Sequence, residues 1–190
     1  MEQIRIVGLA GSLRRASFNR GLIRAAAESA PAGTTIDVFD LADIPLFNQD
    51  VEDAGEPASV AAFKQAIAIA DAVLVATPEY NHGVPGVLKN AIDWASRPLA
   101  TSPLGDKPIA IMGASPGRGS TARAQAQLRD MFVFTGASVM PVPELLGGAA
   151  GTHFSGDGDV TDPELRASIV ELVRALDRWA RRLRVRGEAA

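Results

Sequence analysis

Residues 4–19 read Ile-Arg-Ile-Val-Gly-Leu-Ala-Gly-Ser-Leu-Arg-Arg-Ala-Ser-Phe-Asn, an apolar run followed by a turn that contains glycine and serine. The run has the length and the β-branched content of a buried strand, and a helical pattern begins directly after the turn. A strand, a turn and a helix in this order form the repeating unit of a parallel α/β sheet. The stretch therefore predicts the first strand, loop and helix of an α/β fold.

The same alternation continues along the chain. Apolar runs of four to seven residues occur at 4–10, 36–41, 72–76, 109–112 and 139–142. Helical patterns occur at about 18–30, 57–70, 86–96 and 120–135, and a last helix begins at Asp162-Pro163, with Asp162 as its N-cap. Five strands that alternate with five helices predict a three-layer α/β sandwich with a parallel sheet of order 2-1-3-4-5. We expect one domain over residues 1–190, with an irregular loop at 147–161.

Three loops are predicted to meet on one rim of this sheet. In the order 2-1-3-4-5, ligands bind where the winding reverses, beyond the carboxyl ends of the first and third strands. The loop after the first strand is the turn quoted above, 77–83 follows the third strand, and the glycine-rich segment 113–120 follows the fourth. The rim is therefore the expected ligand site.

Cations surround the start of the first helix. Arg14, Arg15 and Arg20 lie there and no carboxylate does, although a helix N-terminus ordinarily favours acidic side chains. Glycines allow a close approach of the backbone, and such a helix start binds anions. The pattern predicts a site for a ligand's phosphate, held by Ser12, Arg14, Ser17 and Asn19. The alternative is an ordinary capped helix after a glycine turn.

Two common nucleotide motifs are absent, because neither Gly-x-Gly-x-x-Gly nor Gly-x-x-x-x-Gly-Lys-[Ser/Thr] occurs. A mononucleotide therefore fits better than a dinucleotide or a P-loop ligand. The loop after the third strand would suit a flat ring such as isoalloxazine, because Pro78 gives rigidity, Tyr80 a flat side chain, and Glu79 and Asn81 polar reach. The alternative is a proline-marked turn before the next helix, and the role of His82 stays open between acid–base group and bystander.

Composition excludes several classes of protein. The chain has no cysteine, so it can form no disulfide, thiolate metal site or iron–sulfur cluster, and any redox chemistry must belong to a cofactor. A net charge of −3 argues against nucleic-acid binding, and the arginines of the last helix suit its C-terminus. No apolar run approaches a membrane span and no leader is evident, so we expect a cytoplasmic protein without membrane contact. We expect no metal site, because the calcium-loop-like segment 157–162 carries Asp162 where glycine is required.

The motifs together resemble a known family. Gly11-Ser12-Leu13-Arg14 with Ser17 and Asn19, then Pro78-Glu79-Tyr80-Asn81-His82-Gly83, then Pro85-Gly86 with Leu88-Lys89-Asn90-Ala91-Ile92-Asp93-Trp94, are similar to the flavodoxin-like NADPH-dependent FMN reductases. That group contains quinone and chromate reductases and relatives of the azoreductases. The resemblance spans nearly the whole chain.

The resemblance implies non-covalent FMN as cofactor and NADPH or NADH as co-substrate. Hydride would pass from the nicotinamide to the flavin and then to a quinone or similar small acceptor, such as chromate or an azo compound. The FMN phosphate would contact Ser12, Arg14, Ser17 and Asn19, the ring would contact Pro78, Glu79, Tyr80 and Asn81, and Ser115 and Gly117 would close the pocket. Family members are usually dimers or tetramers, so a homodimer or homotetramer is expected.

Arg97, Tyr80 and Asn81 are the residues that the resemblance suggests for the acceptor or the nicotinamide. For Arg97 the alternative is a surface ion pair with Asp93, four residues earlier on the same helix. Arg118 could meet the extra phosphate of NADPH or lie in solvent. A redox-silent flavin- or nucleotide-binding module is the rival function, and a phosphoacceptor domain is disfavoured because the first and third strands end without acidic residues.

Overall fold

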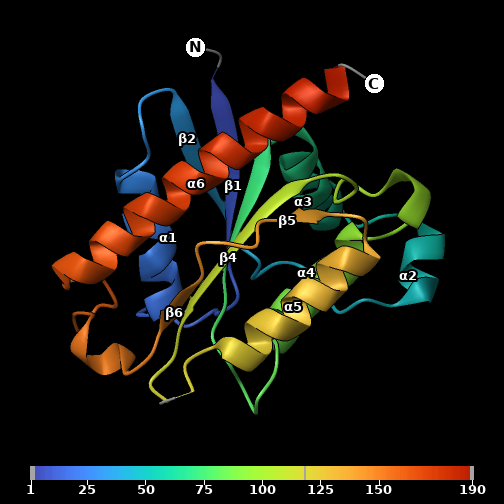
Figure 1. The fold of residues 1–190 in the computed structure, drawn as a ribbon. Helices are drawn as coiled ribbons and strands as arrows, with labels where there is room; N and C mark the ends of the chain where they lie inside the picture. The colour runs from blue at the N-terminus through green and yellow to red at the C-terminus, as the bar shows by residue number, and fades with distance from the viewer. Residues whose placement is uncertain (1–2, 118, 189–190) are drawn as a thin grey trace.

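The computed structural model describes residues 3–117 and 119–188. A parallel sheet lies between two layers of helices (Figure 1). The strands are β1 (Ile4–Ala10), β2 (Thr34–Phe39), β3 (Ala72–Ala76), β4 (Pro108–Ala114), β5 (Ser138–Val139) and β6 (Leu145–Gly147). The α-helices are α1 (Phe18–Glu28), α2 (Gln49–Ala54), α3 (Ala58–Ile69), α4 (Gly86–Ala95), α5 (Ala122–Phe134) and α6 (Pro163–Glu188), and short 3-10 helices lie at Leu99–Thr101 and Ala150–Thr152.

The sheet has the order β2-β1-β3-β4-β5, with every pair parallel, so the predicted fold class is confirmed. The chain winds from β1 outward to β2 and then crosses to β3 on the other side of β1. Helices α1 and α6 cover one face, and α3, α4 and α5 cover the other (Figure 1). The winding therefore reverses between β1 and β3, and this reversal places the loops after these strands side by side.

The fifth strand position differs from the prediction. Instead of one strand at 139–142, β5 pairs with the start of β4 and β6 pairs with its end, both on the same edge. After Met140, whose N–H still donates to the carbonyl of Ile109 at 2.7 Å, residues 141–144 leave the sheet. Pro141 and Pro143 lie in this segment and have no N–H to donate to a ladder, which explains the interruption.

Two further boundaries differ. Strand β2 covers Thr34–Phe39 rather than 36–41, and the short helix α2 was not predicted. None of the six residues of α2 is buried, so the helix has no periodic apolar face that a sequence pattern could reveal. Asn48 caps it, because its side chain accepts a hydrogen bond from the N–H of Asp50.

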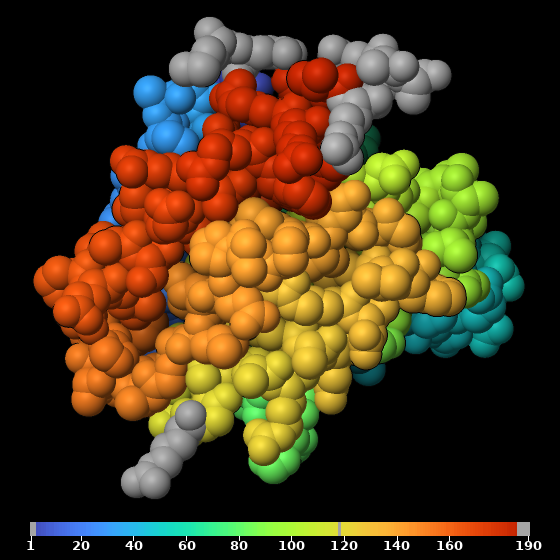
Figure 2. All heavy atoms as spheres, viewed as in Figure 1, coloured from blue at the N-terminus to red at the C-terminus, as the bar shows by residue number. Residues whose placement is uncertain are grey.

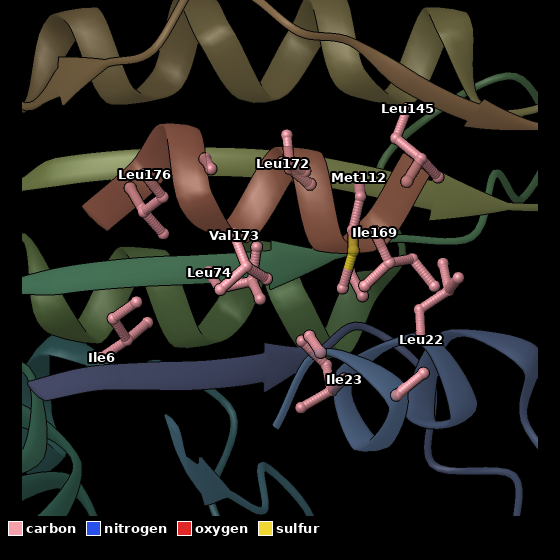
Figure 3. Packing of buried hydrophobic residues seen from close by; sticks show 14 of the residues in the cluster. Ile6, Leu22, Ile23, Leu74, Met112, Leu145, Ile169, Leu172, Val173 and Leu176 are labelled. Atoms are coloured by element: carbon pink, nitrogen blue, oxygen red, sulfur yellow. The ribbon is translucent and has the colours of Figure 1, made fainter. Parts of the chain in front are cut away.

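Two apolar cores flank the sheet. Because successive strand residues point to opposite faces, Ile4 and Ile6 of β1 join the core under α1 and α6, whereas Val7 and Leu9 join the core under α3, α4 and α5. Figure 3 shows Leu22 and Ile23 of α1 and four α6 side chains, Ile169, Leu172, Val173 and Leu176, packed over Ile6, Leu74 and Met112 of the strands. Each fully buried side chain of this size contributes about 2 kcal/mol. Among the helices described, none is long and apolar enough to cross a membrane.

Candidate cofactor site

A cleft lies where the three predicted loops meet, beyond the carboxyl ends of β1, β3 and β4. Its volume is about 260 Å³. It is lined by Ser12, Arg14, Ser17, Phe18, Asn19, Pro78, Glu79, Tyr80, Ala114, Ser115 and Pro116. Eight of the residues predicted from sequence are in this set, and Asn81, Gly117 and Arg97 are not.

The N-terminus of α1 opens toward this cleft. Ser17 is the N-cap and accepts a hydrogen bond from the N–H of Arg20, at 3.4 Å, and the first turn holds no acidic residue. The N–H groups of Phe18 and Asn19 have no partner within the helix, because the first N–H groups of any helix lack one. Buried Ser12 lies alongside, with its Oγ 3.4 Å from the hydroxyl of Tyr80. The site therefore presents hydroxyls and N–H donors at the positive end of a helix dipole.

Of the two arginines nearest this helix start, Arg14 lines the cleft and Arg20 does not. The exposed Arg14 guanidinium lies over the ring of Phe18, 5.1 Å from its centroid. In the part of the chain that the structure describes, no carboxylate forms an ion pair with Arg14. Arg20 instead pairs with Asp40 after β2, and it also donates to the carbonyl of Leu13 at 3.5 Å.

Asn19 is committed inside the protein. Its Nδ2 donates to the carbonyl of Ala114 at 2.9 Å, and its Oδ1 accepts from the N–H of the same residue at 3.0 Å. Asn19 is only 2 % exposed. Its side chain therefore ties α1 to the end of β4. The contact with a phosphate expected from sequence stays a prediction.

Glu79 lines the cleft, and its carboxylate is bound by α5. Its carboxylate accepts from the N–H groups of Arg123 and Ala124, at 3.0 and 3.2 Å, and pairs with the Arg123 guanidinium at 3.2 Å. Burial alone would raise the pKa of Glu79, but the hydrogen bonds from Ala124 and Arg123 hold the pKa below its ordinary value of 4.5. Glu79 therefore caps α5, and its charge is directed at that helix.

The segment that carries Tyr80 is a rigid hairpin. Tyr80 and Gly83 exchange backbone hydrogen bonds of 3.1 and 3.0 Å, and Asn81 and His82 have φ values of 50° and 62°. Two successive positive φ values define a type I′ turn, so both residues sit exposed at its tip. Asn81 does not line the cleft, and its expected contact with the ring stays a prediction.

Helix α5 holds this hairpin at its other end as well. The side chain of Gln127 accepts from the N–H of Val84 at 3.1 Å and donates to the carbonyl of His82 at 3.3 Å. Figure 2 shows the segment after β3, in green, against the start of α5, in yellow, at the lower edge of the molecule. With Glu79 at one end and Gln127 at the other, the hairpin is fixed before any ligand arrives.

The third loop contributes Ser115. This residue is 8 % exposed, and its N–H donates to the carbonyl of Gly147 at 3.0 Å while its carbonyl accepts from Ala150 at 3.3 Å. Its backbone is thus held by β6 and the segment after it. Gly117 faces open space, because an added Cβ would meet no atom within 4 Å. Arg118 lies outside the described residues.

Arg97 is not at the cleft. Helix α4 begins beside the hairpin and runs away from the rim for ten residues, a length of roughly 15 Å, and Arg97 follows its end. Its guanidinium contacts Gln49 and Glu52 of α2 and lies 5.3 Å from the ring centroid of Phe47. The alternative pairing of Arg97 with Asp93 is not formed, because Asp93 pairs with Lys89 at 2.6 Å and Arg97 with Glu52. The role of Arg97 toward the acceptor or the nicotinamide stays a prediction.

Ala114 and Pro116 line the cleft although they were not predicted, and so does Phe18. It lies in the quoted stretch, but an apolar side chain carries no signal for phosphate binding. Its contact with Arg14 depends on how the turn before α1 folds, because Arg14 lies outside the helix. Among the described residues, no group of three or more acidic or histidine side chains could hold a metal ion.

The fold and the cleft together define a flavodoxin-like α/β protein with a cleft at the point where the winding reverses. Residues 4–152 match the model of the NADPH-dependent FMN reductases, and the chain belongs to that family.

Individual relatives agree with this family. The chain is 44 % identical over 183 residues to an NAD(P)H-dependent FMN reductase of Pseudomonas aeruginosa, an alignment that covers 96 % of this chain and 98 % of the relative. It is 46 % identical over 149 residues to a quinone reductase of Escherichia coli, which covers 77 % of this chain and 79 % of the relative. The solved structure of FerB, a flavoenzyme NAD(P)H:(acceptor) oxidoreductase from Paracoccus denitrificans, superposes with a TM-score of 0.85 at 35 % identity, over 94 % of this chain and 98 % of FerB. The predicted family, the enzyme class and the use of FMN and NAD(P)H are thereby confirmed.

The cleft fits FMN at its phosphate end. A phosphate monoester needs several donors and a cation and is repelled by carboxylates. The start of α1 supplies two hydroxyls, free N–H groups and Arg14, and the one acidic residue of the cleft, Glu79, is directed at α5.

Proposed function

We propose that the chain, residues 1–190, works as one FMN-binding domain that oxidises NADPH or NADH and reduces quinones or related small acceptors. The observation that carries this proposal is the start of α1, a helix N-terminus with hydroxyls and a guanidinium around it and no carboxylate in its first turn. The quinone reductase of Escherichia coli supports quinones as acceptors. Chromate and azo compounds are further acceptors to test.

In this proposal, Ser12, Ser17, Arg14 and the N–H groups of Phe18 and Asn19 bind the phosphate. Pro78 and Tyr80 form the platform for the ring, and Ser115 closes the opposite wall. Bound FMN supplies the acceptance and donation of hydride. The side chains of the protein position the reactants and need not move a proton, which is consistent with the exposed place of His82 at the hairpin tip.

We further propose that two or four identical chains assemble and that the protein is located in the cytoplasm. Helix α5 exposes Val133 and Phe134 to 70 and 75 %, an apolar surface that association between copies would cover. Light scattering of the purified protein measures the number of chains. A cytoplasmic location fits an enzyme that consumes NAD(P)H, and cell fractionation tests it.

The test of function begins with the absorbance spectrum of the purified protein, which should show bound flavin. Adding NADPH or NADH without oxygen should bleach the flavin, and a quinone should restore its colour. Flavin that binds but is never bleached would instead support the redox-silent binding module.

The test of the site compares two neighbouring arginines. Arg14→Ala should weaken FMN affinity by roughly tenfold to a hundredfold, because hydrogen bonds to charged groups contribute about 1.5–3 kcal/mol. Arg15→Ala is the matched control, since Arg15 is exposed and does not line the cleft. Equal affinities in both variants would show that the phosphate lies elsewhere.

A further inference from the structure

The hairpin formed by residues 154–160 packs directly on the start of α1. Phe154 and Val160 pair as an antiparallel bridge, and Gly158 turns with φ at 83°. The carbonyl oxygen of Gly158 lies 1.9 Å from the position that a Cβ of Gly21 would occupy, so only glycine fits at residue 21. Backbone therefore touches backbone between the hairpin and the first turns of α1.

Side chains strengthen this contact. Arg24 of α1 pairs with Asp159 of the hairpin at 2.5 Å, and the rings of Phe154 and Phe18 lie 4.8 Å apart, tilted by 39°. Phe154 is 8 % exposed and does not line the cleft. Phe154 thus contacts Phe18, which lines the cleft.

Phe18 in turn supports Arg14. Its ring lies 5.1 Å from the Arg14 guanidinium, within the range of a cation–π contact. Because Arg14 is exposed and no carboxylate among the described residues holds it, this ring is the contact that keeps the guanidinium at the cleft. The order of contacts runs from Phe154 to Phe18 to Arg14.

We propose that Phe154 and Phe18 are positioning residues for the FMN phosphate, because they hold Arg14 in place before the cofactor binds. This inference rests on the proposed function, and it assigns a role to part of the irregular loop at 147–161. Preorganising a binding group raises affinity by removing the entropy cost of ordering it on binding.

The experiment measures the affinity of the apo-protein for FMN and for riboflavin, which lacks the phosphate. Phe154→Leu keeps the apolar bulk and removes the ring. It should weaken FMN binding by at most roughly twofold to fivefold, the fold-change that corresponds to losing the whole Phe18–Arg14 cation–π contact of about 0.5–1 kcal/mol, and leave riboflavin binding unchanged. Phe18→Leu should act in the same direction, so that the test does not depend on one variant.

A double-mutant cycle identifies the route of the effect. In the background of Arg14→Ala, Phe154→Leu should cause no further loss of FMN affinity, because the group that it positions is gone. Phe39→Leu is the matched control, since it removes a ring from the Phe39–Phe63 pair, at 5.1 Å, outside the cleft. This control should leave FMN affinity unchanged.

Three results would overturn the inference: no change in FMN affinity, equal losses for FMN and riboflavin, or an additive loss on the Arg14→Ala background. The wild-type protein is measured first. If it does not bind FMN, the proposed function and this inference fail together, whereas normal wild-type binding with unaffected variants removes this inference alone.

Discussion

Helices α1 and α5 begin on the same rim of the sheet, but different side chains accept hydrogen bonds from the N–H groups at their N-termini. At α5 the protein supplies an anion of its own, because Glu79 accepts from the N–H groups of Arg123 and Ala124. At α1 it supplies only the hydroxyl of Ser17. Helix α6 resembles α5, since Asp162 accepts from the N–H of Glu164 at 2.8 Å and is held by His153. Helices α3 and α4 also have no acidic residue in their first turn, so the missing carboxylate indicates a ligand only at α1, where the helix start also lines the cleft beside Arg14.

The largest expected effect comes from giving α1 a carboxylate. Ser17→Asp should lower FMN affinity by about a thousandfold, because two unit charges about 4 Å apart near a protein surface repel by roughly 4 kcal/mol. Aspartate is as good an N-cap as serine, so the fold should persist. Titration of the apo-protein with FMN measures the loss. Ser17→Asn, a neutral cap, is the control and should retain most of the affinity; if Ser17→Asp also retained it, the phosphate would not bind at α1.

Removing the carboxylate of α5 should cost stability. Glu79→Ala leaves the N–H groups of Arg123 and Ala124 without their acceptor, and the free energy of unfolding should fall by about 1–2 kcal/mol. Urea denaturation measures this loss. Glu144→Ala is the control, because Glu144 forms a surface ion pair with Arg129 at 3.5 Å, and such pairs contribute about 0–1 kcal/mol. Equal losses in both variants would mean that Glu79 is not an effective cap.

The cap on α5 should also depend on pH. The pKa of Glu79 in the folded protein lies below its ordinary value of 4.5, so its stabilising contribution is complete above that pH and is lost as the pH falls through the lowered pKa. The difference in unfolding free energy between wild type and Glu79→Gln should therefore shrink below pH 4.5. Denaturation curves at several pH values test this, and a difference that grew on acidification would contradict it.

The smallest effect is expected at Arg97, which belongs to neither helix start. Arg97→Ala should leave FMN affinity within about twofold of wild type and lower the unfolding free energy by at most about 1 kcal/mol, as for other half-exposed ion pairs. Fluorescence titration and denaturation measure the two quantities. A large loss of FMN affinity would place Arg97 at a cofactor site that this chain alone does not form.

Much of the fold could be predicted because its signals are local. Strands β1 and β3 are visible in the sequence as short apolar runs. The N-cap Asp162 followed by Pro163 indicates the start of α6. The split between β5 and β6 could not be predicted, because it depends on which part of β4 each short segment pairs with. Helix α2 buries no residue and so left no periodic pattern.

For the site, too, features set by neighbouring residues could be predicted and features set by distant residues could not. The phosphate end was predicted from one continuous stretch, and Ser12, Arg14 and Ser17 do line the cleft. Asn19 and Glu79 line the cleft as well, and the sequence did not reveal their partners inside the protein, Ala114, 95 positions away, and Arg123, 44 positions away. A polar side chain in a motif can be expected to form a hydrogen bond. Which group it bonds to depends on the tertiary structure.

The close contact between Gly21 and Gly158 bears on how the protein matures in the cell. The helix that begins the phosphate site emerges early from the ribosome, whereas the backbone that packs against it is made more than a hundred residues later. A nascent chain released or stalled before that point would have the whole motif and still lack its support. Cofactor loading should therefore follow completion of the chain, and FMN retention would report on the folding of its last third.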